Sequence, residues 1–109
     1  MRALILLVVV GCTDDRGPRL ESATPAAAPR GARVMLVGVR LCGEPPKCET
    51  AAGAIQIGLS PPTTLAAVIE YEDGAALIEI PMVTEVGSTE IVVTVNERSS
   101  NALAFEVLP

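Results

Sequence analysis

Histidine is absent from this sequence, and lysine occurs only once, as Lys47. Without histidine, a general base at neutral pH would have to be a carboxylate or that lysine. The segment GLSPP around Ser60 also lacks the second glycine of a G-x-S-x-G nucleophile elbow. No partner base is evident for the serines in the predicted turns, which are Ser60, Ser88, Ser99 and Ser100. The sequence therefore predicts a protein that is not an enzyme.

Aromatic residues are almost as scarce, with no tryptophan, one tyrosine (Tyr71) and one phenylalanine (Phe105). Binding sites for carbohydrates usually present aromatic rings with an apolar body and a polar edge. Because Phe105 is expected in the core, carbohydrate binding is only a minor alternative for this chain.

Metal ligands are also few. A structural zinc site needs four ligands, and the chain has three cysteines and no histidine. Glu70, Glu72 and Asp73 lie close together, but they lack the alternating oxygen ligands of a calcium-binding loop. We interpret them as the solvated end of a strand, and we expect neither a metal nor a cofactor.

The balance of charge excludes one class of partner. The formal net charge is −5 and the basic residues do not cluster, so phosphate backbones should be repelled and no nucleic-acid partner is expected. The chain of 109 residues is long enough for one domain. Since 50% of the residues are hydrophobic and only 2% aromatic, valine, isoleucine, leucine and alanine must form the core.

The opening stretch, MRALILLVVVGC, has the order of a secretory signal peptide. Arg2 supplies a positive start, residues 4–10 form a short apolar run, and the small Gly11 follows. As a helix this run would cover only about 10 Å of the roughly 30 Å hydrocarbon core, so it is too short to span a membrane. A buried first strand is the other interpretation, but it needs neither the positive start nor the abrupt change to the polar residues 13–18.

The last four residues of that stretch, Val9, Val10, Gly11 and Cys12, resemble the bacterial lipobox. The resemblance implies cleavage after residue 11, acylation of Cys12 and anchoring in a membrane by two or three acyl chains. In that family an Asp directly after the cysteine favours the inner membrane. Thr13 stands there in this chain, so we expect a cell-envelope protein at the outer membrane. Residues 12–18 would be a short tether.

The two other cysteines, Cys42 and Cys48, lie in the segment LCGEPPKCE. Glycine and proline residues between them suit a tight loop, and the environment beyond a signal peptide is oxidising. We therefore predict a disulfide between Cys42 and Cys48, contributing roughly 2–2.5 kcal/mol in the chain-entropy model.

The rest of the chain is typical of short strands separated by turns. Apolar and polar residues alternate clearly in the last two segments, as in Ile91, Val93 and Val95. One segment, around residues 63–71, has some helical spacing, but the absence of a cap favours a strand. The predicted strands cover residues 19–23, 32–41, 54–59, 65–72, 76–81, 89–97 and 101–109. Such spacing predicts an all-β antiparallel sandwich or barrel.

Over residues 19–109 the chain resembles the IPT/TIG immunoglobulin-like domains. Gly38 suggests a bulge or a close approach, Pro81 a strand end, and Ser100-Asn101 a hairpin turn. The residues that carry the resemblance are Ala23-Thr24-Pro25, Val34, Leu36, Gly38, Leu41, the segments IQIG at 55–58 and IEIP at 78–81, Gly87, Val93, Val95, Ser100-Asn101, Phe105 and Val107. The resemblance implies an immunoglobulin-like antiparallel β-sandwich of about seven strands, and its members usually serve as interaction or spacer modules.

The strand at 32–41 contains a candidate interaction surface. If Val34 and Leu36 face the core, Met35 and Val37 face outward. Outward apolar residues mark either an interface or a strand that other residues cover, here the Cys42–Cys48 loop. We therefore expect a non-catalytic, membrane-anchored module that binds another envelope protein, with a structural spacer as the alternative.

Overall fold

The computed structural model describes residues 17–43, 48, 53–59 and 62–109. The predicted signal peptide, the lipobox and the tether up to residue 16 lie outside the described residues. Every regular element in the described part is a strand, which confirms the all-β prediction. The strands are β1 (Arg19–Thr24), β2 (Ala27–Pro29), β3 (Arg33–Val39), β4 (Ala54–Gly58), β5 (Thr64–Leu65), β6 (Ala67–Tyr71), β7 (Ala75–Glu79), β8 (Gly87–Val95), β9 (Arg98–Ser99) and β10 (Leu103–Leu108).

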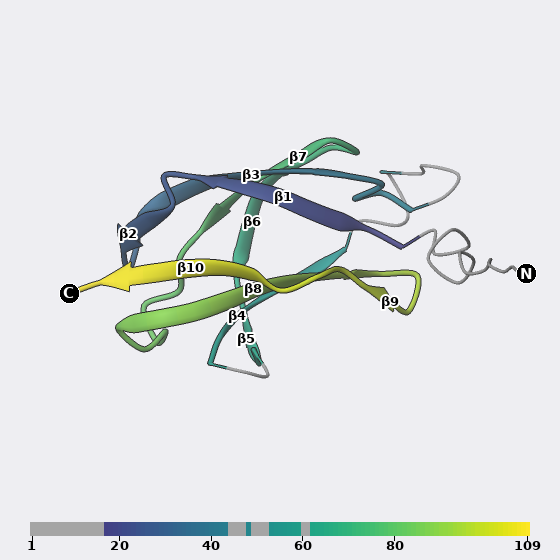
Figure 1. The fold of residues 1–109 in the computed structure, drawn as a ribbon. Coiled ribbons are helices and arrows are strands. Elements are labelled where there is room, and N and C mark those ends of the chain that lie inside the picture. The colour runs from purple at the N-terminus through teal and green to yellow at the C-terminus, as the bar shows by residue number, and fades with distance from the viewer. Residues whose placement is uncertain (1–16, 44–47, 49–52, 60–61) are drawn as a thin grey trace, which may run out of the picture.

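The strands form two sheets that pack face to face (Figure 1). The first sheet has the order β1-β3-β7-β6, and all of its pairs are antiparallel. The second sheet has the order β2-β10-β8-β4-β5, with β9 paired to β8. Among the described strands, β2 alone runs parallel to its neighbour, β10. The fold is therefore a sandwich-like arrangement of two sheets. The described residues include no helix that is long and apolar enough to cross a membrane.

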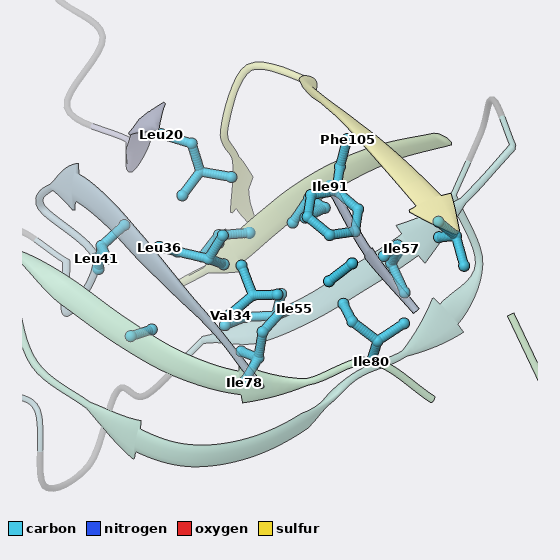
Figure 2. Close-up of a cluster of buried hydrophobic side chains, with 14 residues drawn as sticks. Leu20, Val34, Leu36, Leu41, Ile55, Ile57, Ile78, Ile80, Ile91 and Phe105 are labelled. Carbon is cyan, nitrogen blue, oxygen red and sulfur yellow. The ribbon is translucent and has the colours of Figure 1, made fainter. Parts of the chain in front are cut away.

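The core lies between the inner faces of the two sheets (Figure 2). Val34, Leu36 and Ile78 come from the first sheet, and they are fully buried. The second sheet contributes Ile55, Ile57, Ile91, Val93, Phe105 and Val107. Burying an aliphatic side chain of this size contributes about 1.5–3 kcal/mol, so the alternating strands are driven together by their aliphatic faces.

One of the predicted strands differs from the structure because the chain changes sheets within it. The predicted strand 65–72 divides at Ala66, with Leu65 in β5 of the second sheet and β6 in the first. The chain also changes sheets between β1 and β2, near Pro25. The segment around 63–71 is extended, so the choice of strand over helix is confirmed.

The predicted hairpin turn at Ser100-Asn101 is wrong. The turn between β8 and β9 is formed by Asn96 and Glu97, both with positive φ (53° and 66°), as a tight two-residue hairpin requires. Ser100 and Asn101 instead follow β9 and lead the chain into β10.

Two local predictions are confirmed. A Cβ on Gly38 would collide with the carbonyl oxygen of Arg19, so the glycine permits close approach of β1 to β3, beside a bulge in β1. Pro81 follows the end of β7, where its missing N–H is not needed by the sheet.

Candidate functional site

The outer face of the first sheet contains the predicted interaction residues. Met35 and Val37 alternate with the buried Val34 and Leu36 on β3, so they point away from the core. Val37 is 37% exposed, and Met35 is half-buried between its neighbours in the sheet. The structure thus places both residues outward, as the alternation of the sequence predicts.

Strand pairing extends this apolar surface onto β7. Met35 is the direct partner of Leu77, and Val37 is the partner of Ala75, so all four side chains share one face. On β1, the partners of these rows are Thr24 and Ser22. We call this outer surface of β1, β3, β7 and β6 the Met35 face. Leu77 belongs to it only through the register of β3 with β7, which sequence reasoning did not supply.

The charges on the Met35 face are divided between its two halves. Arg33 on β3 pairs with Glu79 on β7, and Arg19 on β1 pairs with Val39 on β3. On β6, Glu70 is the partner of Leu77. The β1–β3 half therefore has two outward arginines, and the β6–β7 half has two outward glutamates. Glu21 occupies the bulge of β1, so strand pairing does not assign it to this face.

The outer face of the second sheet differs in composition. Its outward residues include Gln56, Glu90 and Thr94, with Val92 as the apolar exception on β8. Two shallow depressions of about 270 and 320 Å³ lie on it, both lined by Ser88, Thr89 and Ala104. Glu106 and Glu90 add negative charge at these depressions. The exposed Leu65 on β5 also lies on this face, but the polar Gln56 on β4 separates it from Val92 on β8.

The Cys42–Cys48 disulfide is present, with a Cα–Cα distance of 4.8 Å. Cys42 is fully buried, and its backbone N–H donates to Asp73 Oδ1 at 3.0 Å. The neighbouring Leu41 N–H donates to the carbonyl oxygen of Asp73. The disulfide corner is thereby fixed to the turn between β6 and β7. Whether its loop covers Met35 and Val37 depends on residues 44–47 and 49–52, which lie outside the described residues.

Asp73 thus helps to fix the fold through its Oδ1 atom. Among the described residues, no group of three or more metal-ligating side chains comes together, and Glu70 points to the Met35 face as the partner of Leu77. Glu72 directly follows β6, and Asp73 lies in the turn between β6 and β7.

Tyr71 joins the two sheets at the same corner. Its hydroxyl donates to the carbonyl oxygen of Leu41 and lies against Gly53, where a Cβ would be only 2.5 Å from the phenolic oxygen. Burial raises the pKa of Tyr71 above its ordinary value, a backbone hydrogen bond from Gly53 opposes this, and the charge of Asp73 adds to the rise. Gly53 precedes β4, so the phenol ties the first sheet to the start of the second.

Asn101 forms a second link between the sheets. Its side-chain amide donates to the carbonyl oxygen of Leu20 at 3.0 Å, and its Oδ1 accepts from the N–H of Leu20 at 2.9 Å. Leu20 belongs to β1, whereas Asn101 leads into β10. This contact spans 81 positions of the chain, so no local pattern in the sequence indicates it.

The serines considered as nucleophiles have structural roles where their contacts are described. Ser100 Oγ accepts from the N–H of Val93 and donates to the carbonyl oxygen of Asn101. Ser99 Oγ shares a hydrogen bond with Thr94 Oγ1. None of these partners is a general base.

The loop between β7 and β8 is a second exposed apolar region that sequence reasoning missed. Met82 and Val83 are 69% and 79% exposed, whereas the adjacent Thr84 is buried. The loop lies at the end of the domain that also holds the C-terminus, opposite the start of β1 (Figure 1). The apolar residues of the segment PMVTEV do not alternate with polar ones as they would in a strand. This irregular spacing was the signal in the sequence that could have indicated an exposed loop.

Comparison of the chain with protein-family models and with curated proteins finds no match.

Proposed function

We propose that this chain is a membrane-anchored lipoprotein of the cell envelope whose immunoglobulin-like domain is a non-catalytic protein-interaction module. The observation that carries the interaction role is the Met35 face, an apolar strip on one sheet bordered by charges of both signs. Apolar centres with polar rims are the usual anatomy of protein interfaces.

The strand order supports an immunoglobulin-like assignment. In that fold one sheet has the order A-B-E-D and the other contains C, F and G. The order β1-β3-β7-β6 matches A-B-E-D, and β4-β8-β10 matches C-F-G. Together with the motif residues quoted above, this order supports the IPT/TIG resemblance, although the disulfide of this chain links Cys42 to Cys48 rather than the two sheets' central strands.

The membrane anchor is supported by the lipobox-like residues Val9, Val10, Gly11 and Cys12. Three acyl chains would hold the protein stably, because each buried methylene contributes about 0.8 kcal/mol. The outer membrane is the favoured location, since Thr13 follows the cysteine.

Carbohydrate binding loses support from the positions of the two aromatic residues. Phe105 is 3% exposed in the core, and the Tyr71 ring is half-buried with its hydroxyl bonded to Leu41. Burial of Phe105 and the partial burial of Tyr71 reduce the aromatic surface that a sugar could stack on.

The anchor is tested by the intact mass of the protein recovered from a bacterial membrane fraction. We expect a chain that begins at Cys12, bears acyl groups and gains mass on reduction of the disulfide. A Cys12→Ser variant should lose the acyl groups and leave the membrane, while a Thr13→Ala control should retain both. A wild-type chain that retains Met1 and has no acyl group would overturn the lipoprotein proposal.

The interaction role is tested by photo-cross-linking in intact cells. A photoreactive residue in place of Val37 should form a defined protein adduct, whereas the same residue in place of Gln56, on the outer face of the second sheet, should not. Absence of any adduct from position 37 would favour the spacer alternative.

A further inference from the structure

The charges on the Met35 face are complementary to those of a second Met35 face that is turned over by a two-fold rotation. Arg33 and Arg19 lie on the β3 and β1 half, and Glu79 and Glu70 lie on the β7 and β6 half. The net charge of the whole chain is −5, yet this face has a positive half and a negative half. A partner must therefore present the opposite charges in the same arrangement, which restricts the partners that fit.

We propose that the Met35 face binds the Met35 face of a second copy of this chain. The two copies are related by a two-fold axis that runs parallel to the strands and passes between β3 and β7. This inference rests on the proposed function, because it names the partner of the proposed interaction surface.

The axis between β3 and β7 brings the two halves into opposition. Each residue of β3 has a partner beside it on β7 of the same chain. In the proposed dimer the β3 residue of one copy lies opposite that same β7 residue of the other copy, and the contact occurs twice, as an isologous interface requires. Arg33 of one copy then faces Glu79 of the other, and the same contact occurs twice. Glu70 of one copy faces Thr24 of the other, because both lie in the row of Met35 and Leu77. Arg19 lies in the row of Val39, so Arg33 and Glu79 alone form the charged contact assigned here.

The apolar rows match in the same arrangement. Met35 of one copy faces Leu77 of the other, and Val37 faces Ala75, so a larger side chain lies opposite a smaller one in the second row. Both rows are half-buried or exposed in the single chain. Their contact would remove the apolar centre from water and leave Ser22 and Thr24 toward the rim.

The size of the face predicts weak association. Four strands at about 4.8 Å spacing and about five residues of about 3.4 Å each give roughly 330 Å² per copy. The total of about 650 Å² is below the size of standard specific interfaces and corresponds to a weak, transient contact. We expect a dissociation constant in the micromolar range or weaker for the protein in solution. Anchoring both copies in one membrane would raise their effective concentration and favour the pair.

The decisive experiment mixes two charge variants of the full chain, purified in detergent and studied by sedimentation equilibrium in density-matched buffer. Arg33→Glu places glutamates opposite glutamates, and Glu79→Arg places arginines opposite arginines. Each variant alone should self-associate about tenfold more weakly than wild type or worse, because like charges then face each other twice. An equimolar mixture of the two should associate about as well as wild type, since each glutamate again faces an arginine.

Glu90→Arg is the matched control, because it makes the same change of charge on the outer face of the second sheet. It should leave association unchanged. The folding of each variant is checked by its circular dichroism spectrum and by retention of the disulfide. Recovery in the mixture cannot come from a repaired pair within one chain, because neither variant carries both substitutions.

Several outcomes would overturn the proposal: a wild-type chain that stays monomeric over the whole concentration range, or single variants that associate normally, or a mixture that does not recover. The mass of the Val37 adduct separates this failure from failure of the proposed function. An adduct of two copies supports self-association. An adduct with a different protein overturns self-association but retains the interaction module, and no adduct overturns both.

Discussion

On the first sheet the outward residues at the centre are Met35, Val37 and Leu77, which are all apolar. The central strands of the second sheet present the polar Gln56, Glu90 and Thr94, with Val92 as one apolar residue among them. The inner faces of the two sheets are alike, because both consist mainly of aliphatic residues in one core, with Phe105 as the aromatic exception. Folding requires the inner residues to be apolar but makes no such demand of the outer ones. The difference between the outer faces therefore points to a role in recognition rather than in stability.

The largest expected effect tests whether the inner faces are equivalent. Ile78→Ala in the first sheet and Ile57→Ala in the second each remove a fully buried side chain. Each should lower the free energy of unfolding by about 2–5 kcal/mol, measured from urea denaturation curves. A loss below about 1 kcal/mol for only one variant would show that the two sheets do not share the core equally.

The next effect concerns the connection from β3 of the first sheet to β4 of the second. The double variant Cys42→Ala/Cys48→Ala should lose about 2 kcal/mol of stability, because the unfolded chain regains the freedom that the closed loop removed. Thermal denaturation of wild type with and without reductant is the control. If the reduced wild type is as stable as the oxidised form, the disulfide does not stabilise this connection.

Asn101 tests a direct tie between the two sheets. Asn101→Ala removes both hydrogen bonds to the backbone of Leu20, so we expect a loss of about 1–2 kcal/mol in chemical denaturation. Ser99→Ala, which removes an exposed hydrogen bond to Thr94, should cost less than about 0.5 kcal/mol. Equal losses in the two variants would contradict a special role for Asn101.

Tyr71 gives a smaller effect with a distinct dependence on pH. Tyr71→Phe removes the hydrogen bond to Leu41 and should cost about 1 kcal/mol at neutral pH. Because the pKa of Tyr71 is raised in the folded protein, the folded state holds this proton more tightly than the unfolded state. The associated stability is fully present below the ordinary pKa of 10.0 and is lost as pH rises through the folded value. Denaturation curves above pH 10.0 should therefore show a steeper loss for wild type than for the variant.

The smallest effect on stability compares the outer faces themselves. Leu77 and Val92 are half-buried outward residues on inner strands of the two sheets. Leu77→Glu and Val92→Glu should each change the free energy of unfolding by less than about 1 kcal/mol. Only Leu77→Glu should abolish self-association in sedimentation. If Val92→Glu has the same consequence, the Met35 face is not the specific interface.

The longer strands were predictable because apolar and polar residues alternate along a half-buried strand. The alternation shows which side chains face the core. On β8 and β10, Ile91, Val93, Phe105 and Val107 are all buried as expected. The short strands β2, β5 and β9, of two or three residues, were not predicted, because so few residues show no period. Their pairing depends on neighbours that are distant in the sequence.

The turn between β8 and β9 was missed for a different reason. Asn96 and Glu97 were included in the predicted strand 89–97, and although Asn96 suits positive φ, Glu97 is not a typical residue for it. The register of β8 with β9 and the hydrogen bonds of Ser100 and Asn101 fix the turn earlier in the chain.

The sequence by itself determined the class of fold, the inward face of each long strand and the cysteine pair, because these depend on local alternation and on spacing within a few residues. Tertiary structure alone decided which outward residues meet. Met35 lies beside Leu77, and Arg33 beside Glu79, only because β3 pairs with β7 in one register. A shift of that register by one residue would turn these side chains toward the core, and only the packing of the aliphatic inner faces excludes it.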